Sequence, residues 1–201
     1  MLEESELFIR SYCTLLELNN VLITSFGDDN NLVENVIKGI SDNPLKNIEI
    51  IYLETSKPKY EQIRNKYAFT PFVNCINIYP ISLVDFNDFT DSKDNINKEE
   101  LNEAISKELR YVIDNNLGQG YLDYIKNENN ISLCILNHCD ITTILELKYL
   151  INKSPAYFIR NNSLFMDDIK NIFDTYGYNL LYQDGKYTMF AKPEIFLYFE
   201  D

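Results

Sequence analysis

The chain has 201 residues, of which 45% are hydrophobic and 24% are charged, so it is long enough and apolar enough to bury the core of a globular domain. Its 31 acidic side chains outnumber its 18 Lys and Arg, which gives a net charge of -13. This charge predicts that neither nucleic acid nor an anionic membrane is a partner, because both require clustered cations.

The composition also predicts the compartment. The first residues, Met1 to Glu6, are acidic, whereas an export signal is basic and then apolar. No apolar run reaches the roughly 18 residues of a membrane span. The four cysteines include no C-x-x-C pair, so a zinc ribbon is not expected. We therefore expect a cytoplasmic protein with reduced thiols.

The first part of the chain alternates between amphipathic helices and short apolar strands. Apolar residues at helical spacing mark the helices, and β-rich runs between turn residues mark the strands. In the first helix, Leu7 and Leu15 belong to the apolar stripe, and in the third helix Phe69 is expected to face inward. The expected elements are a helix over 3–17, a strand over 21–24, a helix with apolar residues over 32–40, a strand over 48–53, a helix opened by Ser56, Lys57 and Pro58, and a strand over 72–79.

The middle of the chain reads as a helical insertion at about 85–130. An acidic, turn-rich loop over 85–98 precedes a predicted helix over 98–115 and a short helix over 121–126. This connection is longer than one helix with its loops. It is expected either to cover a ligand site or to form a surface for a protein partner.

The last part continues the alternation and then ends differently. Asp184 and Gly185 between two β-rich runs are a strong hairpin signal, and Gly177 is the expected residue after the preceding helix. The sequence therefore predicts an α/β fold, with a doubly wound, mostly parallel seven-stranded sheet and a C-terminal antiparallel hairpin. The expected elements are strands over 131–136 and 156–159, helices over 141–152 and 163–176, and hairpin strands over 178–182 and 186–191.

Five strand–helix units followed by this hairpin resemble the Rossmann-like fold of class I S-adenosylmethionine-dependent methyltransferases. The resemblance covers roughly 19–193 and rests on element order more than on motifs. It implies one domain over 1–201, with the last strand inserted antiparallel between its neighbours. It also implies S-adenosylmethionine as the cofactor, bound at the carboxyl ends of the first strands.

The resemblance also assigns cofactor-binding residues. The loop after the first strand is glycine-rich in the family, but here it has the single glycine Gly27. Glu54 stands where an acid accepts hydrogen bonds from the ribose hydroxyls, and it is otherwise one surface acid among many. Tyr79 stands beside the expected adenine position, where it either stacks on the base or only packs at the strand end. The full expected set is Thr24, Ser25, Gly27, Glu54, Tyr79 and Asn137.

His138 is the only histidine of the chain and follows the fourth strand. It is expected to act as a base toward a substrate hydroxyl, with Asp140 orienting it; the alternative is a loop histidine without chemistry. A metal-dependent subgroup of small-molecule O-methyltransferases has acidic ligands here and after the fifth strand. Leu136 and Arg160 are among the residues that replace them, so no metal site of that kind is expected.

Two functions follow from these observations. The first is an S-adenosylmethionine-dependent methyltransferase that acts on a small molecule or a protein. The second is a catalytically inactive relative of that fold which binds or assembles with a partner, as the single glycine and the missing metal ligands suggest. A dinucleotide-binding protein is disfavoured, because no G-x-G-x-x-G motif occurs.

Overall fold

The computed structural model describes residues 3–24, 30–43, 49–54, 57–77, 130–137, 142–161 and 165–196. The described strands form one seven-stranded sheet with the order β3-β2-β1-β4-β5-β7-β6. Strands β1 to β5 run parallel, and β7 lies antiparallel between β5 and β6. This confirms the predicted sheet and its inserted last strand. The strands are β1 (Asn20–Thr24), β2 (Glu49–Glu54), β3 (Val73–Asn77), β4 (Ile131–Leu136), β5 (Ala156–Arg160), β6 (Asn179–Gln183) and β7 (Tyr187–Ala191).

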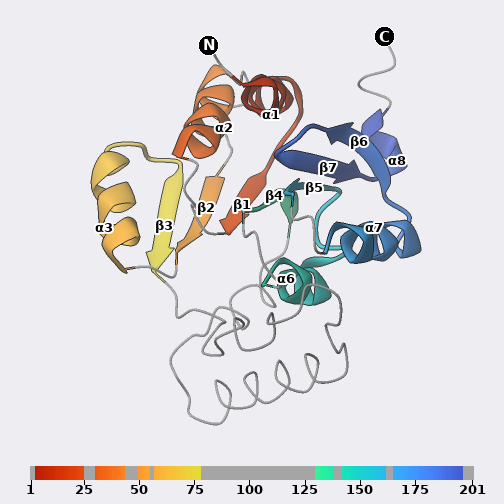
Figure 1. Ribbon diagram of the computed structural model, residues 1–201. Helices are drawn as coiled ribbons and strands as arrows, with labels where there is room; N and C mark the ends of the chain where they lie inside the picture. Colours follow the sequence, from red (N-terminus) through yellow and green to blue (C-terminus); the bar gives the residue numbers. More distant parts are fainter. Residues whose placement is uncertain are drawn as a thin grey trace, which may run out of the picture.

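Helices cover both faces of the sheet (Figure 1), because its central strands are apolar on both sides. In β1, Val21 and Ile23 pack into the core cluster beneath α1 and α2, whereas Leu22 packs into the opposite cluster beneath α6 and α7. The described helices are α1 (Glu4–Leu15), α2 (Asn30–Asp42), α3 (Lys57–Lys66), α6 (Thr142–Leu150), α7 (Met166–Thr175) and the short α8 (Pro193–Phe196).

The α1–α2 pair is held by a close approach at Gly39. A Cβ added at Gly39 would lie 2.5 Å from the carbonyl oxygen of Arg10. Asn43, just after α2, donates from Nδ2 to the carbonyls of Cys13 and Leu16, both at 2.9 Å, and so ends α1. The helix is therefore shorter than predicted. The inward placement of Leu7 and Leu15 was wrong, since both side chains are exposed.

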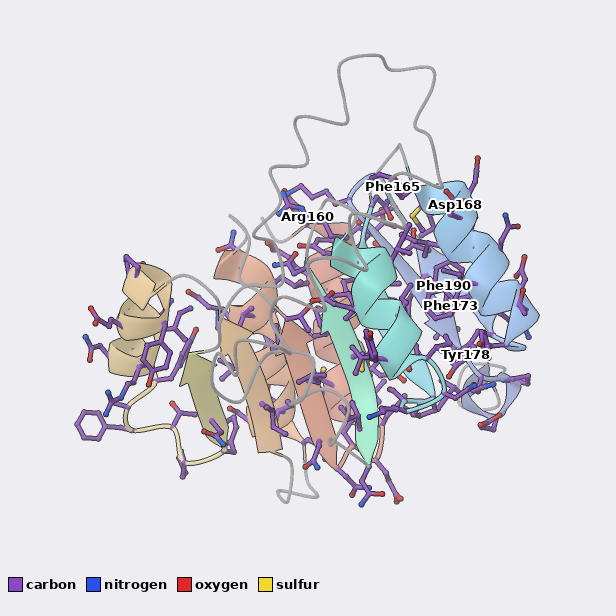
Figure 2. The ribbon with its side chains drawn as sticks, turned by 90° about the horizontal axis from the view of Figure 1, so that it is seen from below. Arg160, Phe165, Asp168, Phe173, Tyr178 and Phe190 are labelled. Atoms are coloured by element: carbon purple, nitrogen blue, oxygen red, sulfur yellow. The ribbon has the colours of Figure 1, made fainter. Side chains whose placement is uncertain are left out.

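Aromatic side chains fill the space between α7 and the C-terminal strands. Phe173 of α7 stacks on Phe190 of β7, with ring centroids 4.2 Å apart. Tyr178 meets Phe173 edge-on at 5.3 Å, and Figure 2 shows the three rings together. Gly177 has φ +73°, which confirms it as the residue that ends α7.

The hairpin turn is built on Asp184. Its Oδ1 accepts from the backbone N–H groups of Lys186 and Tyr187, both at 2.7 Å, and its Oδ2 accepts from the Tyr182 hydroxyl at 2.8 Å. Burial alone would raise the pKa of Asp184, but these donors outweigh it and lower that pKa below its ordinary value. Lys186 also pairs with Glu3 at 2.6 Å, which ties the hairpin to the start of α1.

The helical insertion at 85–130 lies outside the described residues, and so do the predicted helices within it. Within the described residues, no helix has both the length and the apolar character needed to cross a membrane.

Candidate functional site

The carboxyl ends of β2, β1 and β4 lie next to one another in the sheet. Thr24 ends β1 in register with Leu53 of β2, so Glu54 follows one position further along the neighbouring strand. On the other side, the backbone N–H of Asn137 donates to the Thr24 carbonyl at 3.3 Å. The structure thus brings Thr24, Glu54 and Asn137 to one edge, where the cofactor was predicted. Their roles in binding it stay predictions.

Thr24 directs its side chain toward α6. It is fully buried and lies two residues after Leu22, on the same face of the sheet. Its Oγ1 is 3.2 Å from Oε2 of Glu146 and 3.4 Å from the carbonyl oxygen of Ile135. The Thr24 hydroxyl is therefore engaged within the protein.

Glu146 of α6 is a buried acid that the sequence analysis missed. Its side chain is 0% exposed, in a chain whose acids are otherwise expected at the surface. A buried carboxylate needs hydrogen-bond donors, and the Thr24 hydroxyl is one of them. Its helical spacing could have predicted this burial, because Glu146 falls three residues after the buried Thr143 and four before the buried Leu150.

Asn137 points to the other face of the sheet, since it lies two residues after Ile135 of the α1–α2 cluster. It is 1% exposed, and its Oδ1 accepts a hydrogen bond from the Tyr187 hydroxyl at 3.1 Å. The Tyr187 ring stacks on Phe158, with centroids 4.9 Å apart. This contact joins the carboxyl end of β4 to the start of β7.

At the carboxyl end of β5, the side chain of Asn161 likewise connects the strand end to the hairpin. Its Nδ2 donates to the Asp184 carbonyl at 2.8 Å, and its Oδ1 accepts from the Thr188 hydroxyl at 2.6 Å. The sequence alone gave no indication of this role. The amide of Asn161 thus fixes the hairpin turn at this edge. Among the described residues no three His, Cys, Asp or Glu side chains gather in a group that could hold a metal.

The remaining predicted site residues lie outside the description. Ser25, Gly27 and Tyr79 follow β1 and β3 there, and so do the predicted catalytic residues His138 and Asp140 beyond β4. The backbone of Glu54 is described, but its side chain is not. The structure therefore leaves the roles of these residues as predictions, and the expected lack of a metal site as well.

Comparisons with known proteins identify the fold. No protein-family model matches the chain, and its sequence matches no curated protein. Among solved structures, a methyltransferase from Geobacter sulfurreducens matches 96% of this chain and 80% of its own, with TM-score 0.60 and 5% identity. An S-adenosylmethionine-dependent O-methyltransferase from Thermotoga maritima gives TM-score 0.51 at 8% identity, over 96% of this chain and 66% of its own.

The 23S rRNA methyltransferase ErmE also has this fold, with TM-score 0.52 and 8% identity over 96% of this chain and 68% of its own. The chain therefore has the class I methyltransferase fold, as the resemblance predicted. The exclusion of nucleic acid was wrong, because this fold also serves a methyltransferase named for rRNA. Net charge describes the whole chain, whereas a nucleic acid meets only part of its surface.

Proposed function

We propose that the chain is an S-adenosylmethionine-dependent methyltransferase whose cofactor lies across the carboxyl ends of β2, β1 and β4. The observation that carries the proposal is the order of the sheet, with β7 antiparallel between β5 and β6. Solved structures of two methyltransferases are similar in fold over 96% of the chain. The convergence of Thr24, Glu54 and Asn137 on one edge supports the proposed binding position.

The bound cofactor would supply an electrophilic methyl group, and the residues of the chain would bind, orient and exclude water. Methyl transfer depends mainly on alignment, so few fixed catalytic groups are needed. Glu54 would accept hydrogen bonds from the ribose hydroxyls. For a hydroxyl acceptor, His138 would take the proton and Asp140 would orient its ring. The buried Glu146 would favour a cationic ligand over an anionic one at this edge.

The methyl acceptor is proposed by class. The acidic charge supports a small molecule or a protein, as the sequence analysis expects. RNA is a third possible methyl acceptor, because only the net charge of the whole chain counted against it. The four cations of α3, against one acid, favour RNA.

The second candidate function is that of an inactive relative which binds or assembles with a partner. One observation favours it: the loop after β1 contains the single glycine Gly27, where backbone must approach the cofactor closely. Such a protein would keep the sheet and the core while failing to bind S-adenosylmethionine.

The test of the proposed site compares Glu54→Ala with Glu17→Ala in calorimetric titrations with S-adenosylhomocysteine. Glu17 is an exposed acid on the chain between α1 and β1, at the amino end of that strand. Loss of a charged hydrogen bond to the ribose should cost about 1.5–3 kcal/mol, or roughly 10–150-fold in affinity. Equal affinity of both variants would remove Glu54 from the site.

A further inference from the structure

Helix α3 is a cationic segment in an acidic chain. Its 10 residues contain one acid, Glu61, out of the 31 in the chain. They contain four of the 18 Lys and Arg, namely Lys57, Lys59, Arg64 and Lys66. The side chain of Arg64 is exposed. Lys66 pairs with Glu34 of α2, yet 48% of its side chain remains exposed. Glu61 is exposed as well, so the excess of positive charge on α3 is one of composition, four cations against one acid, with Arg64 its exposed cation outside the Lys66–Glu34 pair.

The turn after α3 presents an aromatic ring. Phe69 is 99% exposed, which corrects the expectation that it faces inward. The helix ends at Lys66, so the helical spacing that would bury Phe69 stops before it is reached. The neighbouring surface carries hydrogen-bonding groups, since the amides of Gln62 and Asn65 are exposed as well. The three features together are cations, a free ring and two amides.

This surface leads toward the candidate cofactor site. Helix α3 packs against β2 and β3 and stands at the outer end of the sheet in both views (Figures 1 and 2). Its first residue, Lys57, comes three positions after Glu54 at the carboxyl end of β2. Ten helical residues span about 15 Å. A strand laid along α3 from Phe69 therefore approaches the edge that holds Thr24, Glu54 and Asn137.

We propose that α3 and the turn through Phe69 form a binding surface for single-stranded RNA. The exposed Arg64 and Lys66 meet backbone phosphates, and the free Phe69 ring stacks on an unpaired base. The exposed amides donate to and accept from the ribose 2′-hydroxyl, a group that DNA lacks. An anionic bilayer fits less well, because it would bury a broader apolar area than the ring of Phe69 surrounded by amides and charges. The RNA-binding surface itself does not depend on the proposed function. Only the further step, in which the bound RNA is the methyl acceptor, rests on that function.

The test measures the fluorescence anisotropy of a labelled, unpaired oligoribonucleotide, without cofactor, in salt from about 50 to 200 mM. Phe69→Ala should weaken affinity at least about fivefold, because one stacked base is lost. Leu15→Ala is the matched control, since Leu15 is a 72% exposed apolar residue on α1. Arg64→Gln should make the slope of log K against log salt shallower by about 0.7, whereas Lys170→Gln on α7 should leave it unchanged.

Several outcomes would overturn the inference. These are the absence of RNA binding at low salt, equal losses in Phe69→Ala and Leu15→Ala, or equal affinity for DNA of the same sequence. Capture by vesicles of anionic lipid, without capture of RNA, would assign the surface to a membrane instead. Because no cofactor is present, these results are independent of whether the chain binds S-adenosylmethionine.

Discussion

Replacing Gly39 with alanine should destabilise the protein, although alanine is the better helix former. In an exposed helix the change would stabilise by about 1 kcal/mol. Here the added Cβ would lie 2.5 Å from the carbonyl oxygen of Arg10 and 2.8 Å from Cβ of Cys13. Relief requires α1 to move away, and overpacking of this kind costs about 1–3 kcal/mol or more. Because the close atom is backbone, the cost should be about 3 kcal/mol, and after the gain in helix propensity of about 1 kcal/mol we expect a net loss of about 2 kcal/mol.

Thermal unfolding followed by circular dichroism measures this loss, which should lower Tm by about 4–8 °C. Gly185→Ala is the control, because a Cβ there meets nothing within 4 Å. A Gly39→Ala protein that melts at or above the wild-type temperature would refute the described packing of α1 on α2. Since α2 follows the loop after β1, the same variant also shows whether a shift of this helix weakens cofactor binding.

Two further predictions concern the carboxyl edge of the sheet and the hairpin. Tyr187→Phe removes the hydroxyl that donates to Asn137 but keeps the ring stacked on Phe158. The free energy of unfolding, measured by urea titration, should therefore fall by about 1 kcal/mol. An unchanged free energy of unfolding would contradict the hydrogen bond. Because the native pKa of Asp184 is lowered, its ionisation stabilises the fold above the unfolded pKa of about 3.9, and this contribution is lost as pH falls through the native pKa. Asp184→Asn should therefore lose less stability than wild type between neutral and acidic pH, and parallel pH profiles would contradict that assignment.

The sheet could be predicted from the sequence because its signals are local. The strand over 131–136 was predicted with the bounds that β4 has, since a run of six residues, five of them apolar, stands between turn residues there. The Asp184-Gly185 hairpin also depends on neighbours in sequence, through the hydrogen bonds of the Asp184 carboxylate. Most of the fold could therefore be predicted from sequence patterns that span only a few residues.

The buried polar contacts could not be predicted, because they join residues far apart in sequence. Glu146 is buried against Thr24, 122 positions earlier, and Tyr187 meets Asn137 across 50 positions. An acidic residue is normally expected at the surface. Its helical spacing indicates burial only when the buried face of the helix is already known. For Phe69, helical spacing was extended beyond the last residue of α3, which is why its exposure was missed.

On the proposed function, the carboxyl ends of β2, β1 and β4 bind S-adenosylmethionine. Calorimetric titration of the purified protein with S-adenosylmethionine and with S-adenosylhomocysteine tests it most directly. We expect both ligands to bind with a Kd near micromolar, which corresponds to a binding free energy of about -8 kcal/mol. The absence of both heat and thermal stabilisation at millimolar ligand would contradict it, and would instead support a protein that keeps the fold without the cofactor.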